Sequence, residues 1–337
     1  MNVLVVNCGS TSIKYRVYSF DGGSLKELLH GLVERIGEKG SKIRNHEQGI
    51  KEMLGCIEKA GIKLESIPLV GHRVVHGGEI SESRIIDRKL IKLIEKYIEL
   101  APLHNPVNLA GIRGVMKFLP KAKNVAVFDT AFHQSLPEYA YCYALPYEFL
   151  KQGIRRYGFH GTSHKYVAER CAELLGKRFD RLNAITCHLG AGCSITAIRN
   201  GKSVDTSMGL TPLEGLMMAT RCGDVDAGIL IHLLRKGISE DELDMMLNKK
   251  SGLLGVSGVG KDMRLILKCM KKNKRCRLAF DMFCYRVRKY ICAYLGVLER
   301  VDAIVFTAGI GEHVPLVRKK SCHLPQMRIL IDDKKNN

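Results

Sequence analysis

Two segments, Asn7-Cys8-Gly9-Ser10-Thr11-Ser12 and His188-Leu189-Gly190-Ala191-Gly192-Cys193-Ser194, repeat one pattern at places far apart in the chain. Each follows a β-branched, apolar run and leads into a segment of alternating polarity, which predicts a strand, a tight turn and a second strand. Glycine lets the backbone approach a ligand, and free turn N–H groups beside small hydroxyls suit an anion. One such turn is more often a plain hairpin. Two of them predict a duplicated fold that grips a polyphosphate, and so a phosphoryl-transfer enzyme.

The composition is that of a globular protein long enough for two domains. The chain has 337 residues, of which 46% are hydrophobic and 26% charged. The chain starts without a basic segment, and no apolar run approaches the roughly 18 residues of a membrane helix. We therefore expect a cytoplasmic protein with no signal peptide and no membrane partner.

Cysteine usage points to the same compartment. The twelve cysteines include no CxxC pair and no zinc-type spacing, and many lie in apolar runs. We interpret them as buried free thiols in a reducing cytosol, and we expect neither a disulfide framework nor a cysteine metal site.

The formal charge of +19 is large, and much of it falls in and around the run from Lys271 to Arg277. Such a run is more often a solvated surface than a binding site, although it would attract an anionic substrate. Without aromatic interleaving or a nucleic-acid motif, no specific nucleic-acid partner is expected.

Hydrophobic periodicity predicts an α/β order in both halves. Strands are expected at 2–7, 12–18, 26–34 and 124–129, and helices at 46–60, 87–99 and 107–118, while 69–73 is a short apolar segment. The second half predicts a helix at 163–175, strands at 183–189 and 193–199, helices at 226–236, 239–247 and 276–298, and a buried strand at 302–307. A backbone turn is expected at Ala308-Gly309-Ile310-Gly311-Glu312. The domain boundary is placed near Phe132 or His133.

Three charged residues are candidates for chemistry. Asp129 ends an apolar strand, where a carboxylate suits Mg²⁺ or simply caps a helix or turn. Arg73 and Arg221 are each followed within a few residues by glycine, and a guanidinium can bind carboxylate or phosphate in fork geometry. A surface salt bridge is the alternative for either arginine.

His160, in Tyr157-Gly158-Phe159-His160-Gly161-Thr162-Ser163, could donate a hydrogen bond to a developing charge, or it could be a structural histidine. His104 and His76 allow the same two interpretations. Ser10, Ser12 and Lys14 share one face of a strand, so Lys14 points toward any phosphate at the turn unless that strand is merely an exposed edge.

With these residues in place, the chain resembles the acetate/propionate/butyrate kinase family of the actin-like and sugar-kinase superfold. The resemblance runs from residue 1 to about 312, in family order, and is loose over about 20–66. It rests on VLVVNCGSTSIKY, GHRVVHGGE, LAPLHNP, VFDTAFHQSLPEYAYCYALPY, RRYGFHGTSHKYVAER, ITCHLGAGCSITAI, SVDTSMGLTPLEGLMMATRCGD, KKSGLLGVSG and DAIVFTAGIGE.

The resemblance implies two duplicated ribonuclease H-like (actin-like ATPase) domains, 1–132 and 133–337, with a nucleotide cleft between them. It also implies reversible transfer of the ATP γ-phosphoryl to acetate, giving acetyl phosphate and ADP, with Mg²⁺ (or Mn²⁺) and a homodimer. The carboxylate is already ionised at neutral pH, so alignment and charge neutralisation suffice for catalysis.

The implied roles fall on named positions. The catalytic set is Arg73, Asp129, His160 and Arg221. The substrate-binding set is Arg73, Val75, Leu103, Phe159 and Pro212. ATP binding is implied for Ser10, Ser12, Lys14, His188, Gly190, Gly192, Asp262, Met263, Arg264, Gly309, Ile310 and Gly311. Asn7 and Asp129 are implied at the metal, and His104 is a secondary active-site histidine.

The chain departs from the family at a few positions. Ala191 stands where Asn is usual in the second phosphate loop, His313 where Asn is usual, and Ala227 where Pro often stands. The match decays after Glu312, and the family's terminal strand, its Asn-Glu-Glu motif and its last helix are not found. We therefore keep alternatives open: an impaired kinase-like protein that binds nucleotide or a partner, or a propionate kinase.

Overall fold

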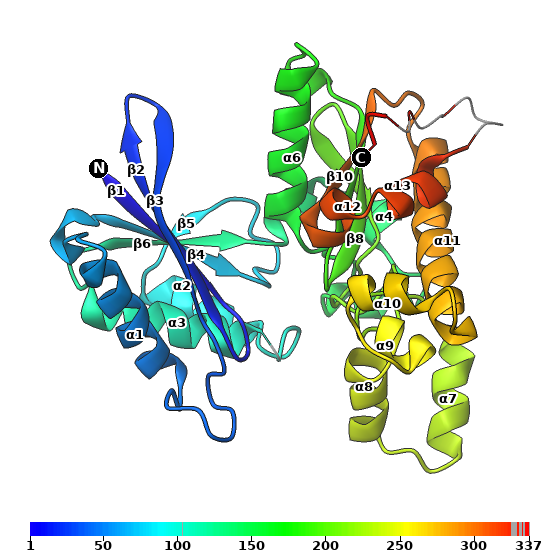
Figure 1. The fold of residues 1–337 in the computed structure, drawn as a ribbon, viewed down its shortest axis with the longest axis horizontal. Helices are drawn as coiled ribbons and strands as arrows, with labels where there is room; N and C mark the ends of the chain where they lie inside the picture. The colour runs from blue at the N-terminus through cyan, green and yellow to red at the C-terminus, as the bar shows by residue number, and fades with distance from the viewer. Residues whose placement is uncertain (103, 325–328, 330–331, 333, 337) are drawn as a thin grey trace. The chain divides into compact units, whose positions relative to one another are not determined.

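The computed structural model describes residues 1–102, 104–324, 329, 332 and 334–336. The chain divides into two compact units, Met1–Gln134 and Ser135–Asn337 (Figure 1). Each unit is built around its own mixed sheet.

The sheet of the first unit has the strand order β3-β2-β1-β4-β6-β5. Strands β1 and β2 pair antiparallel, with Asn7 opposite Lys14, which confirms the first predicted hairpin. Strands β4 and β6 continue the sheet in parallel with β1. The bounds are β1 (Asn2–Cys8), β2 (Ile13–Asp21), β3 (Ser24–Val33), β4 (Leu69–Val74), β5 (Arg84–Ile85) and β6 (Lys123–Phe128).

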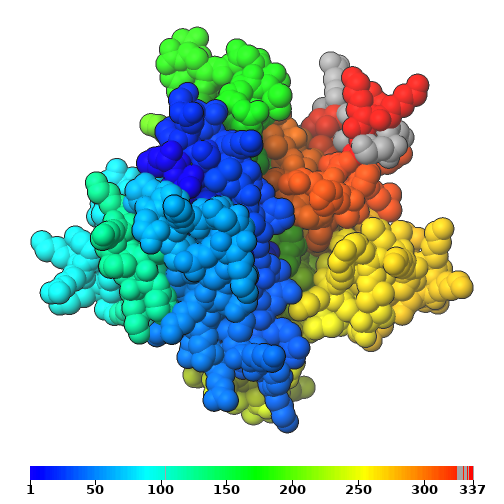
Figure 2. All heavy atoms as spheres, turned by 60° about the vertical axis from the view of Figure 1, so that its left-hand side comes forward, coloured from blue at the N-terminus to red at the C-terminus, as the bar shows by residue number. Residues whose placement is uncertain are grey.

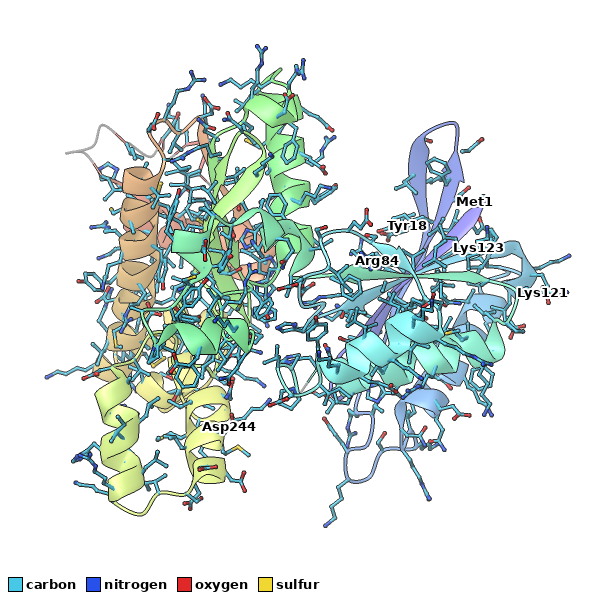
Figure 3. The ribbon with its side chains drawn as sticks, turned by 180° about the vertical axis from the view of Figure 1, so that it is seen from behind. Met1, Tyr18, Arg84, Lys121, Lys123 and Asp244 are labelled. Atoms are coloured by element: carbon cyan, nitrogen blue, oxygen red, sulfur yellow. A yellow bond between two sulfur atoms is a disulfide. The ribbon has the colours of Figure 1, made fainter. Side chains whose placement is uncertain are left out.

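Helices α1 (His46–Lys59), α2 (Arg88–Lys96) and α3 (Asn105–Phe118) lie on one side of this sheet (Figure 1). Asn45 and Asp87 cap α1 and α2 by accepting backbone N–H bonds at their starts. Helix α1 buries Ile50, Met53, Leu54 and Ile57 in the unit's core, as its periodicity predicts. Basic side chains such as Lys121, Lys123 and Arg84 stay at the outside of the unit (Figure 3).

The sheet of the second unit has the order β10-β7-β8-β9. Strand β7 (Ala184–Leu189) pairs antiparallel with β8 (Cys193–Arg199), and β8 pairs antiparallel with β9 (Lys202–Thr206). Strand β10 (Ala303–Thr307) lies parallel to β7. The order and directions repeat those of β4-β1-β2-β3, which confirms the duplication expected from the two turns.

Helices α6 (Gly161–Leu174) and α11 (Lys274–Val297) cover the two faces of this sheet, so nearly every residue of β7 and β8 is buried (Figure 1). Helices α8 to α10 form a bulge of this unit (yellow in Figure 2). The other helices are α4 (Glu138–Tyr141), α5 (Tyr147–Lys151), α7 (Ala227–Arg235), α8 (Glu240–Lys249), α9 (Gly252–Ser257), α10 (Met263–Cys269), α12 (Ala308–His313) and α13 (Pro315–Cys322). Short 3₁₀ turns lie at Leu64–Ser66, Ala131–Ser135 and Phe179–Arg181.

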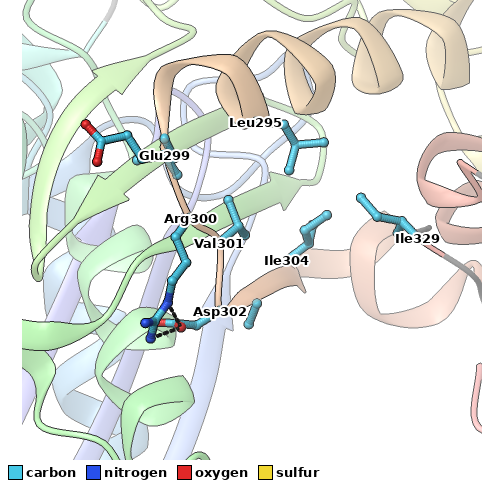
Figure 4. A pocket seen from close by; sticks show the side chains of 9 residues that line it. Leu295, Glu299, Arg300, Val301, Asp302, Ile304 and Ile329 are labelled. Atoms are coloured by element: carbon cyan, nitrogen blue, oxygen red, sulfur yellow. Dashed lines mark hydrogen bonds and ion pairs between the residues drawn. The ribbon is translucent and has the colours of Figure 1, made fainter. Parts of the chain in front are cut away.

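The structure corrects two local predictions around β10. All five residues of the strand are half-exposed rather than buried, because β10 is at the edge of its sheet among the described strands. Beside it lies a hollow of about 430 Å³, rimmed by the Arg300–Asp302 ion pair (Figure 4). The expected turn at 308–312 is instead the short helix α12.

The expectation that every cysteine is a free thiol is also wrong. Cys269 at the end of α10 and Cys276 near the start of α11 form a disulfide, while the other ten cysteines are free. Asn273 caps α11 in the turn between the two helices. This turn brings the Cα atoms of the two cysteines to 6.1 Å from each other. None of the described helices is long and apolar enough to cross a membrane.

Candidate functional site

Arg73 and Asp129 form the charged centre of the first unit. Both lie at the carboxyl ends of the neighbouring parallel strands β4 and β6, which is why residues far apart in sequence meet. Arg73 Nη2 is 2.6 Å from Asp129 Oδ2, and Arg73 Nε is 2.9 Å from Oδ1. Asn7, at the matching end of β1, accepts from Arg73 Nη1 through Oδ1 at 3.4 Å. The structure thus brings together three residues that the sequence singled out separately.

The electrostatics of this pair are asymmetric. The Asp129 side chain is only 2% exposed, whereas that of Arg73 is 37% exposed. The carboxylate raises the pKa of Arg73 above its ordinary value, because the two charges are in contact. A guanidinium has five N–H bonds. In the described contacts of Arg73, three of these N–H groups donate to Asp129 and Asn7. Two N–H groups are then left to bind an anion.

The first turn is closed by a bond from Gly9 N to Ser12 O at 2.7 Å. Ser10 is exposed and Ser12 is half-exposed, so their hydroxyls can reach a ligand. The His46 ring contacts the Gly9 carbonyl at 2.8 Å and ties the turn to the start of α1. Lys14 and Asn7 line one hollow of about 390 Å³.

The residues expected around the acyl group lie in both units. Val75 is buried in the first, where its N–H donates to Asn108 Oδ1 at 3.0 Å. Phe159 is buried in the second. His104 occupies the N-cap position of α3, but its side chain makes no capping bond. Leu103 lies outside the described residues.

A cavity of about 640 Å³ opens beside the second turn. Its walls come from the turn itself, the loop before α9, the start of α10 and helix α12. Of the expected ATP-binding residues, it brings together Gly190, Gly192, Asp262, Met263, Arg264, Gly309 and Ile310. His188 and Gly311 are not among its lining residues. Arg221, expected for catalysis, also lines it.

The loop that carries Arg221 is held by backbone bonds. Leu253 N, at the start of α9, donates to Met218 O at 2.8 Å, and Ala219 N donates to Ala191 O at 3.0 Å. Gly252 has φ +61°, and a Cβ there would lie 2.2 Å from Met218 O, so the position requires glycine. The guanidinium of Arg221 donates from Nη1 to Pro212 O at 3.2 Å. This fixes Arg221 next to the second phosphate turn.

His160 has the left-handed backbone conformation (φ +57°), which is uncommon for a residue other than glycine. Its Nδ1 lies 2.8 Å from Ser194 Oγ, and its ring stacks on that of His188 with 4.1 Å between centroids. A Cβ added at Gly192 would lie 3.4 Å from His160 Nε2 and 3.6 Å from Arg221 Nη1. The Nε2 edge of the ring therefore lies beside Gly192, which lines the cavity, although His160 itself is not among the lining residues.

Comparison with known proteins identifies the family to which the chain belongs. Residues 2–337 match the acetokinase family. The chain belongs to the acetokinase family. It is 51% identical over 363 aligned residues to the acetate kinase of Fervidobacterium nodosum, covering 100% of this chain and 89% of that protein. Among solved structures, Porphyromonas gingivalis acetate kinase matches with a TM-score of 0.92 and 44% identity, covering 100% of this chain and 90% of that one. A propionate kinase from Francisella tularensis matches with a TM-score of 0.93 and 41% identity, covering 99% and 91%.

Membership confirms the expected actin-like fold and the expected activity, phosphoryl transfer with a carboxyl group as acceptor. Acetokinases use ATP, so a nucleotide site is expected in this chain. Gly190, Gly192 and Arg221 line the cavity, and turn N–H groups and a guanidinium are suitable donors to an anion.

Several lining residues of this acetokinase were missed from the sequence: Thr220, Lys261, His313 and Val314. Lys261 precedes Asp262, which caps α10 by accepting from Arg264 N at 2.8 Å and pairs with the Arg264 side chain. The side-chain hydrogen bond from Arg264 lowers the pKa of Asp262 below its ordinary value. Helix α10 has only about two turns, which is too short for a hydrophobic periodicity that would predict a helix.

Asn7 and Asp129, the two residues implied at the metal, both contact Arg73 in the first unit. Among the residues that the structure describes, no cluster of three or more His, Cys, Asp or Glu side chains could hold a metal ion. Mg²⁺ usually takes one or two carboxylates and otherwise phosphates and water. Asp129 has about four lone-pair sites, of which Arg73 uses three, so Oδ1 has one left beside the amide oxygen of Asn7.

Proposed function

We propose that this protein transfers the γ-phosphoryl group of ATP reversibly to acetate in a direct, in-line, Mg²⁺-dependent reaction. A carboxylate oxygen of acetate forms a bond to the γ-phosphorus, and the bond from that phosphorus to the β–γ bridging oxygen breaks. The products are acetyl phosphate and ADP. The single observation that carries the proposal is the cavity where Arg221 lies beside the Gly190–Gly192 turn, because it offers positive charge and N–H groups to a polyphosphate.

The residues have separate tasks in this proposal. Arg73, oriented by Asp129, binds the acetate carboxylate through its remaining N–H groups. Arg221 and His160 donate to the transferring phosphoryl, whose charge spreads over three oxygens in the transition state. Val75 in the first unit and Phe159 and Pro212 in the second supply apolar surface for the methyl group. Asn7 and Asp129 hold the Mg²⁺–nucleotide, and bound Mg²⁺ neutralises charge on the phosphates.

The test is acyl phosphate formation from ATP, Mg²⁺ and acetate, trapped with hydroxylamine. We expect turnover in the wild type, and a loss of about 10³-fold in kcat/KM for Arg221→Ala, by analogy with arginine fingers. Arg199→Ala, on β8 and away from the cavity, is the matched control and retains turnover. Tight ATP binding without turnover in the wild type would instead support the alternative of a kinase fold retained for binding.

Acetate and propionate differ by one methylene, which is worth about 1–3 kcal/mol in an apolar pocket. Because the chain is also similar to a propionate kinase structure, the assay should be run with both acetate and propionate. We expect a higher kcat/KM with acetate than with propionate. The reverse order would make this protein a propionate kinase.

We also propose a homodimer that forms through helix α7. No residue of this helix is buried, and Val225, Ile229, Ile231 and Leu234 are 40–51% exposed. Apolar exposure on this scale is typical of an interface between chains. Light scattering should give twice the monomer mass for the wild type and the monomer mass for Ile231→Glu, while Tyr166→Glu on α6 stays dimeric.

The proposed location is the cytoplasm. Ten of the twelve cysteines are free, which is typical of a reducing compartment. Fractionation of the source cells with an antibody to this chain tests the assignment, and recovery with the membrane or secreted fraction contradicts it.

A further inference from the structure

Four side chains form a continuous hydrogen-bonded row behind the phosphate pocket of the second unit. Thr186 Oγ1 lies 2.7 Å from His164 Nδ1, and His164 Nε2 lies 2.7 Å from Ser194 Oγ. Ser194 Oγ lies 2.8 Å from His160 Nδ1. Thr186, Ser194 and His164 are completely buried, and they come from β7, β8 and α6. We call these four residues the relay row.

We propose that the relay row fixes His160 as a neutral imidazole with its proton on Nε2, so that His160 donates to the transferring phosphoryl. Thr186, His164 and Ser194 are then positioning residues, none of which touches the substrate. The inference deepens the proposed function and rests on it for the identity of the anion.

Counting protons leaves two arrangements for the row. A hydroxyl has one proton, so Ser194 can donate to only one of its two imidazole neighbours. In the first arrangement Thr186 donates to His164, His164 Nε2–H donates to Ser194, and Ser194 donates to His160 Nδ1. The proton of a neutral His160 is then on Nε2. In the second arrangement every bond is reversed, and His160 Nε2 has a lone pair.

Thr186 decides between the two. Its hydroxyl has one hydrogen-bond partner among the described residues, His164. In the first arrangement the hydroxyl proton is used in that bond. In the second, Thr186 only accepts, and its proton is left without an acceptor at a site with no exposure to water. An unsatisfied buried donor is unfavourable, so the row runs from Thr186 toward His160.

The surroundings of His160 favour the same state. The Nε2 side of its ring faces Gly192 and Arg221, which both line the pocket where an anion would bind. An N–H attracts a phosphoryl oxygen there, whereas a lone pair repels it. Titratable groups near His160 include His164, the stacked ring of His188 and Arg221. A positive charge on the imidazole beside that of Arg221 would be unfavourable, which favours the neutral form.

The decisive variant is Thr186→Val, which removes the hydroxyl and keeps the shape. Its matched control is Thr196→Val. Thr196 is the cross-strand neighbour of Thr186, is equally buried, and bonds to Thr206 rather than to a histidine. Thr186→Ser restores a hydroxyl and serves as the rescue.

Two readouts separate positioning from a structural role. Long-range ¹H–¹⁵N spectra of the wild type should show His160 as the Nε2–H tautomer, and Thr186→Val should populate the Nδ1–H tautomer. We expect kcat to fall about 10-fold in Thr186→Val, because a fraction of the molecules would lose the Nε2–H donor of His160. The KM should stay within about twofold of the wild-type value. Thr196→Val and Thr186→Ser should stay near wild type in both readouts.

An unchanged tautomer in Thr186→Val would overturn the inference, as would equal losses of kcat in Thr186→Val and Thr196→Val. The spectra require no turnover. A wild type that forms no acetyl phosphate but shows the Nε2–H tautomer would therefore contradict the proposed function and leave the relay row standing.

Discussion

At the scale of single residues, the buried carboxylate of Asp129 determines where Arg73 points. We expect Asp129→Asn to lower kcat/KM by at least 10²-fold and to destabilise the first unit by about 1–3 kcal/mol, because a half-buried guanidinium loses its counter-charge. Steady-state assays and urea unfolding measure the two effects. Glu27→Gln is the matched control, since Glu27 pairs with Arg16 at an exposed site that contributes little. Equal destabilisation in both variants would contradict this account.

Gly192 determines how closely the second phosphate turn approaches His160. An added Cβ would lie 3.4 Å from Cε1 and Nε2 of the imidazole, at the limit of ordinary van der Waals contact, so it would sit directly against the ring. We expect Gly192→Ala to fold normally and to lose roughly 10-fold or more in kcat, since small displacements of catalytic groups are costly.

The control for Gly192→Ala is Gly55→Ala on α1, where a Cβ meets open space. That variant should gain about 0.5–1 kcal/mol in unfolding free energy from helix propensity and keep full kcat. Full kcat in Gly192→Ala would show that the close approach has no role in catalysis.

At the scale of elements, the sequence predicted what periodicity and turn chemistry specify. Helix α1 and the β1–β2 and β7–β8 hairpins were predicted close to their bounds, because each is long enough to show its own repeat. The short helices α9 and α10 were not predicted, since two turns at most give no clear repeat. The prediction for β10 was wrong in its burial, because an apolar composition is typical of a buried strand and does not show that the strand lies at the edge of its sheet.

The candidate site divides in the same way. Arg73, Asp129 and Gly190 stand at recognisable strand ends and turns, so the sequence predicted them. Thr220 and Val314 reach the cavity only through the folding of separate loops, and no local pattern marks them. Thr186, His164 and Ser194 of the relay row were missed for the same reason, because they are ordinary strand and helix residues until the packing of α6 on the sheet brings them together.

His72 couples β4 to β6 and gives the first unit a pH-dependent stability. The ring is 2% exposed and contacts Asn124 Oδ1 at 2.8 Å. Burial lowers the pKa of His72 from 6.5 to about 4, so the unfolded chain binds a proton before the folded one does. The contribution of His72 is complete above about pH 6.5 and is lost as the pH falls toward about 4, where the folded state also binds the proton.

Over that interval we expect this histidine to contribute a slope of about 1.4 kcal/mol of unfolding free energy per pH unit. Urea unfolding of the wild type and of His72→Gln, which keeps a donor toward Asn124, measures the difference. The exposed His232→Gln on α7 is the control and should not change the slope. Parallel pH curves for wild type and His72→Gln would contradict the assignment.

At the scale of the whole molecule, duplication explains why the chemistry is distributed as it is. In each unit the first hairpin of the sheet turns beside the end of a parallel strand. Arg73 lies on such a strand, β4. Arg221 reaches the second turn differently, through the loop fixed to Ala191 and α9. The repeat therefore supplies two turns of similar backbone and different side chains.

The net charge of +19 acts on the molecule as a whole. We expect the association rate constant for ATP to fall about 10-fold between about 20 and 300 mM salt while kcat stays constant, because salt screens long-range attraction more than contacts inside the site. Stopped-flow binding with a fluorescent ATP analogue measures the rate. Lys261→Gln, at the cavity, should reduce the salt dependence more than Lys249→Gln, which removes the same charge at the end of α8. A rate that ignores salt, or equal effects of the two variants, would mean that ATP is captured by local contacts alone and that the basic surface has no part in guiding it.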